Sequence, residues 1–129
     1  METEPKHILV VEDELPLRQV LADKLIEQGF EVTTAINGEE GLHLALEKHP
    51  DLILLDLVMP IMNGLTMLEK LRTDTSYGAS ARVILLTNIT DREKVARATE
   101  ASSYDYLIKS DWDLNDVVKR IRARLSLVK

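Results

Sequence analysis

The sequence predicts an α/β domain built on a parallel sheet with helices on both faces. Three observations favour this class. Short apolar runs alternate with helix-like segments along the whole chain. Glycine, proline and asparagine stand between these segments, where turns are expected. Five strand–helix units in succession imply a doubly wound sheet, because parallel neighbours are joined by helical crossovers.

Five segments are expected to form the strands of this sheet. The third consists of four consecutive apolar residues between Asp51 and Asp56, and such a run between turn formers is typical of a buried strand. The expected strands are residues 7–11, 31–35, 52–55, 82–87 and 104–108.

The expected helices follow the strands, and several carry start or stop signals. Gly29 should end the first helix, and Asn37 should cap the second with Glu40 three residues on. Ser110 and Asp113 have the same spacing before the last helix. The fourth helix, roughly residues 91–101, has few apolar residues and should be held least firmly. The expected inward residues of the other four helices are Leu17, Val20, Leu21 and Leu25; Leu42, Ala45 and Leu46; Leu65, Leu68 and Leu71; and Leu114, Val117, Val118, Ile121 and Leu125.

The composition is that of a single globular domain covering residues 1–129. The sequence is 45% hydrophobic and 29% charged, which is ordinary for a soluble protein. It has no cysteine, which excludes disulfides and thiolate chemistry. With no apolar stretch of membrane-spanning length and no signal peptide, a cytoplasmic location without membrane contact is expected. The net charge of −6 argues against direct nucleic-acid binding.

Residues suited to chemistry stand at the ends of several expected strands. Glu12 and Asp13 follow the first strand, Asp56 follows the third, Thr87 closes the fourth and Lys109 follows the fifth. In an open parallel sheet these ends meet at one edge, where ligands bind. Any one of these residues is more simply a helix cap or an ion-pair partner. All five at successive strand ends favour a functional site.

The expected site combines a metal with an oxygen nucleophile. Three converging carboxylates take up a proton or bind a cation, and all-oxygen ligands favour Mg²⁺. Asp13 and Asp56 are expected to bind the ion directly, Glu12 through water, and the backbone carbonyl of Val58 can complete the set.

Asp56 is then an oxygen nucleophile beside groups that can hold a phosphoryl group. Lys109 can neutralise one phosphoryl oxygen, and the Thr87 hydroxyl can donate a hydrogen bond to another. Positioning and charge neutralisation supply most of what phosphoryl transfer needs.

The motifs of this chain are similar to those of receiver domains of two-component response regulators. The matching segments are residues 8–14, 51–56, 59–60, 63–64, 85–87 and 105–109. The resemblance implies a flavodoxin-like (βα)₅ fold with strand order 2-1-3-4-5. It implies that Asp56 accepts a phosphoryl group, with Mg²⁺, from a sensor histidine kinase or a histidine phosphotransfer protein. It also implies a switch in which Thr87 moves toward the phosphate and Tyr106 turns inward, with output through the face made by helix 4, strand 5 and helix 5.

One departure from the family pattern and a set of variable positions carry further expectations. Ser110 replaces the proline that usually follows the lysine, and a cis bond before a non-proline residue costs about 3 kcal/mol. A trans bond is therefore expected, with Lys109 still reaching the site. The residues expected to tune the phosphoryl lifetime are Val58, Asn88 and Ile89. Because Val58 and Ile89 are apolar and cannot orient an attacking water, slow autodephosphorylation is expected.

The leading interpretation is a single-domain response regulator that acts on a downstream protein or in a phosphorelay. The alternative is a receiver domain from a DNA-binding transcriptional regulator, which would form a phosphorylation-dependent homodimer. A metal-dependent aspartyl phosphatase is disfavoured because Val58 takes the place of its usual general acid. A flavodoxin-like cofactor binder is disfavoured by the acidic residues after the first strand, and a degenerate receiver by the complete set of site residues. We expect a phosphoacceptor with self-catalysed phosphorylation and dephosphorylation only, and no other enzyme activity.

Overall fold

The chain forms one five-stranded parallel sheet with strand order β2-β1-β3-β4-β5. The computed structural model describes residues 5–87, 105–108 and 113–125, and the side chains of residue 87 and residues 105–108 lie outside that description. The predicted α/β class and strand order are confirmed. The strands are β1 (His7–Val11), β2 (Glu31–Ala35), β3 (Leu52–Asp56), β4 (Val83–Thr87) and β5 (Asp105–Ile108).

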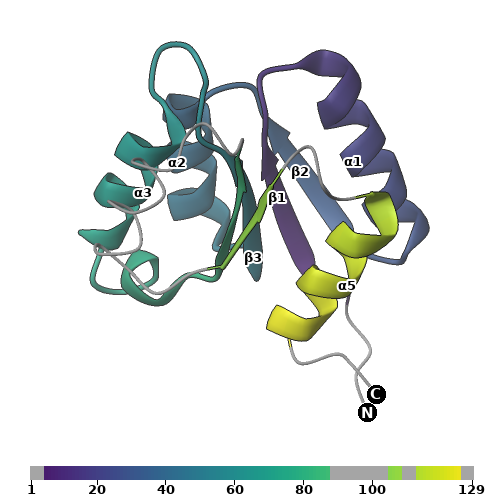
Figure 1. Cartoon of the computed structure of the whole chain (residues 1–129). Helices are drawn as coiled ribbons and strands as arrows, with labels where there is room; N and C mark the ends of the chain where they lie inside the picture. The colour runs from purple at the N-terminus through teal and green to yellow at the C-terminus, as the bar shows by residue number, and fades with distance from the viewer. Residues whose placement is uncertain (1–4, 88–104, 109–112, 126–129) are drawn as a thin grey trace.

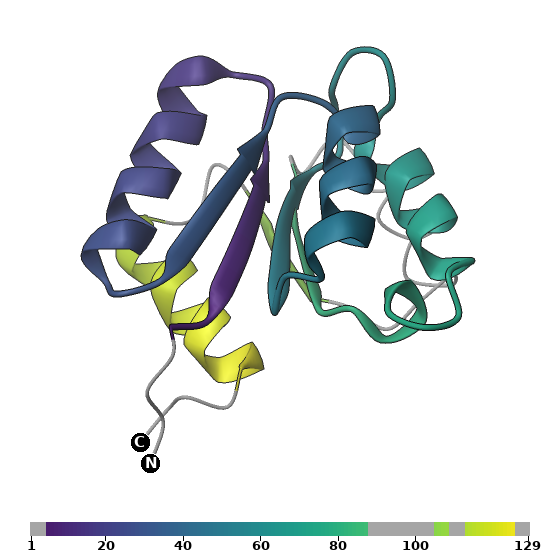
Figure 2. The ribbon, with the colours of Figure 1, turned by 180° about the vertical axis from the view of Figure 1, so that it is seen from behind.

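Helices cover both faces of this sheet. The helices α2 and α3 lie on one face and α1 and α5 on the other, as the two opposite views show (Figures 1 and 2). Their bounds are α1 (Leu15–Glu27), α2 (Gly38–Lys48), α3 (Gly64–Arg72) and α5 (Leu114–Arg124), with a short 3₁₀ helix η1 (Gly78–Ser80) before β4. The helix expected near residues 91–101 lies outside the described residues. Within the described part of the chain, no helix has the length and apolar character needed to cross a membrane.

The sheet separates two apolar cores. Alternate residues of β1 supply both, since Leu9 and Val11 join the core beneath α2 and α3 while Ile8 and Val10 join the core beneath α1 and α5. All five residues of β3 are buried, including Asp56. A central parallel strand covered on both faces carries a run of apolar residues rather than an alternation, as residues 52–55 do.

The N-terminus of α2 follows the prediction, and that of α5 does not. Asn37 Oδ1 accepts a hydrogen bond from the Glu40 N–H at 2.8 Å, as expected of a cap. The cap of α5 is Asp113, which exchanges reciprocal hydrogen bonds with Asp116. The predicted Ser110–Asp113 pair is therefore wrong, because Asp113 and Asp116 repeat the same spacing one turn later and carboxylates cap well.

Two side chains differ from their expected environments. Val20 and Leu46 were expected to face inward but are 46% and 38% exposed, because they lie at the margins of the apolar stripes of α1 and α2. Arg122 makes contacts that the sequence did not predict. Its guanidinium lies over the Phe30 ring at 5.1 Å and donates to the Gln28 backbone carbonyl, so it joins α5 to the end of α1.

Candidate functional site

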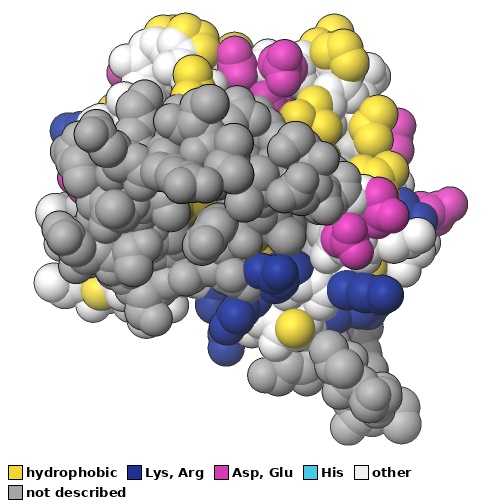
Figure 3. Space-filling view, in the orientation of Figure 1, with side chains coloured by type: hydrophobic (Ala, Val, Ile, Leu, Met, Phe, Trp, Pro, Cys, Tyr) yellow, Lys and Arg dark blue, Asp and Glu magenta, His cyan; other side chains and the backbone are white. Residues whose placement is uncertain are grey.

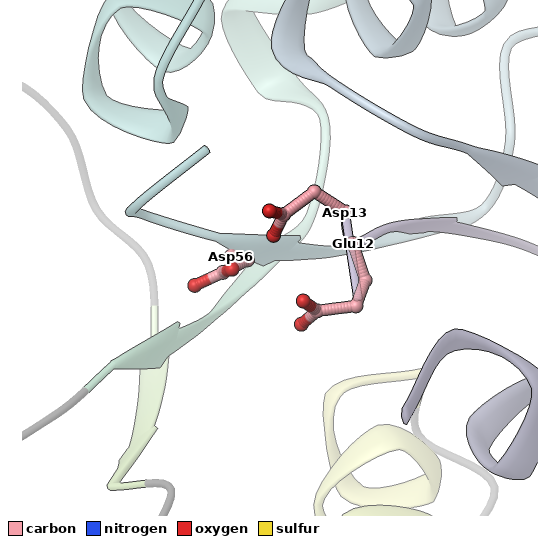
Figure 4. A group of neighbouring side chains, drawn as sticks. All are labelled: Glu12, Asp13 and Asp56. Atoms are coloured by element: carbon pink, nitrogen blue, oxygen red, sulfur yellow. The ribbon is translucent and has the colours of Figure 1, made fainter. Parts of the chain in front are cut away.

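Three acidic side chains converge at the carboxyl edge of the sheet. Glu12 and Asp13 follow β1, and Asp56 is the last residue of the neighbouring strand β3. One carboxylate oxygen from each residue lies within 4.8 Å of the corresponding oxygens of the other two (Figure 4). The structure therefore brings together carboxylates that are 44 positions apart in the sequence, counting from Glu12 to Asp56.

Two of these three carboxylates are almost fully removed from solvent. Glu12 is 0% exposed and Asp56 is 3% exposed, whereas Asp13 is more exposed. Backbone N–H groups in the following loops orient both buried side chains. Glu12 Oε2 accepts from the Glu14 N–H at 3.1 Å, and Asp56 Oδ1 accepts from the Val58 N–H at 3.3 Å. Such bonds hold carboxylates in place at a strand end where burial alone would disfavour them.

The loop after β3 requires a glycine for a steric reason. The Gly64 N–H donates to the Leu57 carbonyl at 2.9 Å, which draws the start of α3 against the end of β3. A β-carbon at Gly64 would meet the Asp56 carbonyl oxygen and lie 2.9 Å from the Leu57 α-carbon. Asn63 caps the helix by accepting from the Thr66 N–H at 2.8 Å. The Asn63–Gly64 pair thus sets the backbone position of Asp56.

Arg18 is a site residue that the sequence reasoning missed. Its Nη1 atom donates to the backbone carbonyls of Glu12 at 2.9 Å and Asp13 at 3.2 Å. The available signal was a cation close to the start of α1, where the helix dipole disfavours positive charge. A cation in such an electrostatically unfavourable position indicates that a specific partner stabilises it.

The remaining predicted site residues either are described by their backbone alone or lie outside the described residues. Thr87 closes β4, where its register partner is Ile108, and Tyr106 pairs with Leu85 within β5. Lys109, Asn88 and Ile89 lie outside the described residues. The expected roles of Lys109 and of the Thr87–Tyr106 switch therefore stay predictions.

The acidic group fits a small divalent cation. Two oxygens on opposite sides of a Mg²⁺ ion are about 4.2 Å apart, since each ligand bond is about 2.1 Å. The carboxylate oxygens of Glu12, Asp13 and Asp56 already lie within 4.8 Å of one another, so small side-chain movements would complete such a shell. Figure 3 shows acidic side chains on the surface at the top of the molecule, with apolar side chains on either side. These three residues could hold a metal ion.

The fold and this acidic site define a known class of signalling domain. The sequence matches the response regulator receiver domain over residues 8–122, and the chain belongs to this family. It is 39% identical over 115 residues to the regulatory protein AtoC of Escherichia coli, covering 88% of this chain and 24% of that protein. It is 35% identical over 125 residues to the DNA-binding response regulator MtrA of Mycobacterium tuberculosis, covering 97% of this chain and 53% of that protein.

A solved structure of a similar receiver domain contains a magnesium ion. The receiver domain of the sensor histidine kinase PA1611 from Pseudomonas aeruginosa has a TM-score of 0.85 and 25% sequence identity, with 95% of this chain and 98% of that chain covered. That structure has a magnesium ion coordinated in its active site cleft. The chain is thus a receiver domain that spans about a quarter of AtoC and about half of MtrA.

Proposed function

We propose that Asp56 accepts a phosphoryl group in a Mg²⁺-dependent reaction. The observation that carries this proposal is the buried Asp56 carboxylate at the end of β3, held within 4.8 Å of the Glu12 and Asp13 carboxylates. Glu12, Asp13 and Asp56 are the proposed side-chain ligands, and the Val58 carbonyl is the proposed backbone ligand. When bound, Mg²⁺ would neutralise charge on the phosphoryl oxygens.

The proposed step is an in-line transfer from a phosphohistidine. An Asp56 carboxylate oxygen attacks the phosphorus atom and forms a P–O bond while the P–N bond to the donor imidazole breaks. The imidazole nitrogen keeps the bonding electron pair and leaves as a neutral ring once protonated. Asp56 is oriented for this role by the Val58 N–H, which donates a hydrogen bond to Oδ1 at 3.3 Å. Lys109 and Thr87 are the proposed partners of the transferred oxygens.

The proposed phosphodonor is a sensor histidine kinase or a histidine phosphotransfer protein, because receiver domains of two-component systems are phosphorylated by histidine kinases. The proposed output is a rearrangement in which Thr87 and Tyr106 move together. The proposed reader of this output is a downstream protein. The alternative reader is a further domain of a longer regulator, since this chain spans only about a quarter of AtoC and about half of MtrA.

The decisive experiment is phosphorylation by acetyl phosphate followed by intact-mass measurement. With Mg²⁺ the wild type should gain the mass of one phosphoryl group, and with EDTA it should gain none. Asp56→Asn should stay unmodified. Asp51→Asn is the matched control, because Asp51 stands at the opposite end of β3, where its side chain accepts a hydrogen bond from the His7 N–H. Equal phosphorylation of wild type and Asp56→Asn would refute the assignment.

We further propose that the phosphoryl group on Asp56 is long-lived. Val58 lies two residues after Asp56 and is 51% exposed, so it presents an apolar side chain beside the site where a polar one could orient water. Ile89 is expected to act in the same way. The loss of phosphoryl label should accelerate in a Val58→Asn, Ile89→Glu double variant. An unchanged decay rate would show that these positions do not limit hydrolysis.

A further inference from the structure

We propose that Arg18 is a positioning residue that sets the orientation of the metal-binding carboxylates of Asp13 and Glu12. This inference rests on the proposed function, since it concerns the same Mg²⁺ site. Arg18 belongs to α1, whereas the acidic residues lie in the connection that precedes this helix. Its role would be exerted through the backbone, because both of its hydrogen bonds end on carbonyl oxygens.

The two carbonyls that Arg18 contacts belong to the two peptide planes on either side of the Asp13 α-carbon. The Glu12 carbonyl is part of the Glu12–Asp13 peptide, and the Asp13 carbonyl is part of the Asp13–Glu14 peptide. One Nη1 atom holds both, at 2.9 Å and 3.2 Å. Fixing both planes fixes the φ and ψ angles of Asp13, which are the only soft backbone dihedrals of a residue. The direction of the Cα–Cβ bond of Asp13, from which its carboxylate projects, is then determined.

The second of these peptides also orients Glu12. Its carbonyl oxygen accepts from Arg18, and its N–H, on Glu14, donates to Glu12 Oε2 at 3.1 Å. A rotation of this peptide would therefore break the contact with Arg18 and the contact with Glu12 together. Arg18 thus secures the geometry of two carboxylates while touching neither of them.

The charge of Arg18 makes this proposal testable, because positioning and electrostatics predict opposite effects. A cation bonded to the loop that carries Glu12 and Asp13 repels Mg²⁺, so its removal on electrostatic grounds alone should tighten Mg²⁺ binding. A cation at this end of α1 is also disfavoured by the helix dipole. If Arg18 instead positions the carboxylates, its removal should weaken binding, as loss of a group that orients metal ligands usually does.

The test is calorimetric titration of Mg²⁺, without a phosphodonor, into wild type, Arg18→Met, Arg18→Lys and Lys24→Met. Arg18→Met keeps most of the aliphatic stem and removes the donors. Lys24→Met is the control for loss of a cation from the same helix, since Lys24 pairs with Glu27 at 3.3 Å. We expect Mg²⁺ affinity to fall roughly ten-fold in Arg18→Met, to be partly restored in Arg18→Lys, and to stay close to wild type in Lys24→Met.

A second readout in metal-free protein separates positioning from general stability. Exchange of the Glu14 amide hydrogen should accelerate in Arg18→Met more than exchange of amides in the middle of α1, because the peptide plane of Glu14 loses its anchor. Unchanged or tighter Mg²⁺ binding by Arg18→Met, with wild-type exchange at Glu14, would overturn the proposal. If the wild type itself bound no Mg²⁺, the proposed function would fail, while the exchange measurement would still decide whether Arg18 fixes the loop.

Discussion

Replacement of Gly64 by alanine should destabilise this domain, although alanine is the better helix former. Gly64 is the first residue of α3. On helix propensity alone, Gly64→Ala would stabilise the protein by up to about 1 kcal/mol. The structure predicts the opposite sign, because the new β-carbon would meet the Asp56 carbonyl oxygen and lie 2.9 Å from the Leu57 α-carbon.

The expected magnitude follows from what must move. Both obstructing atoms belong to the backbone of β3 and its exit, so no side chain can rotate away to relieve the contact. Overpacking of this kind costs about 1–3 kcal/mol, which exceeds the gain in propensity. Because the obstructing atoms are backbone atoms, we place the cost in the upper part of this range, at about 2–3 kcal/mol, and after the gain of up to about 1 kcal/mol we expect a net loss of about 1–2 kcal/mol in the free energy of unfolding. Because the displaced backbone carries Asp56, Mg²⁺ affinity and the rate of phosphorylation should also fall.

Urea unfolding in Mg²⁺-free buffer, followed by Mg²⁺ titration, measures both effects. Gly29→Ala is the matched control. Gly29 has φ of 96°, and a β-carbon there would have no atom within 4 Å, so its cost of about 1 kcal/mol comes from the backbone conformation alone. Gly29 follows the C-terminus of α1, whereas Glu12 and Asp13 precede the N-terminus of this helix. Gly29→Ala should therefore keep wild-type Mg²⁺ affinity. A Gly64→Ala protein as stable as wild type would refute the argument from close approach.

Three further perturbations test other parts of the structure. Ile61 has a φ angle of 68° and is 77% exposed. Because asparagine tolerates this backbone conformation better than isoleucine, Ile61→Asn should raise the free energy of unfolding in urea by about 1 kcal/mol. A loss of stability would show that Ile61 makes contacts that outweigh its strain. Hydrogen bonds from the Gly78 and Tyr77 N–H groups hold the pKa of Asp74 below its ordinary value of 3.8, so its stabilising effect is present above that value and is lost as the pH falls through the lower, folded-state pKa. Asp74→Asn should therefore lose less stability than wild type during acid titration, and parallel titration curves would contradict this. The Tyr77 hydroxyl donates to the Pro50 carbonyl at 2.8 Å, and the Tyr77 ring stacks on His49. Tyr77→Phe should keep the stack but lower the stability by about 1 kcal/mol, measured by thermal unfolding. An unchanged Tm would indicate that water replaces the hydroxyl.

Periodicity and strand order account for most of what could be predicted about the fold. The apolar run before Asp56 identified a central strand, because a strand buried on both faces carries consecutive apolar residues rather than alternating apolar and polar ones. Elements identified in this way predicted a parallel sheet with Glu12, Asp13 and Asp56 at its carboxyl edge, and the resemblance to receiver domains implied the strand order. The cap of α5 was predicted one turn too early, since two acidic or hydroxylic pairs with the same spacing compete there and composition does not choose between them.

The sequence by itself therefore determined which elements form, their order, and which edge of the sheet carries the carboxylates, because these depend on local patterns and on the general chirality of parallel sheets. Only the tertiary structure decided how the site is held. Arg18 reaching back to the Glu12 and Asp13 carbonyls, and Gly64 closing against Asp56, both depend on the path of loops and on distances between segments. Such distances have no periodic signature, since a loop is shaped by the elements that it joins rather than by a repeat of its own.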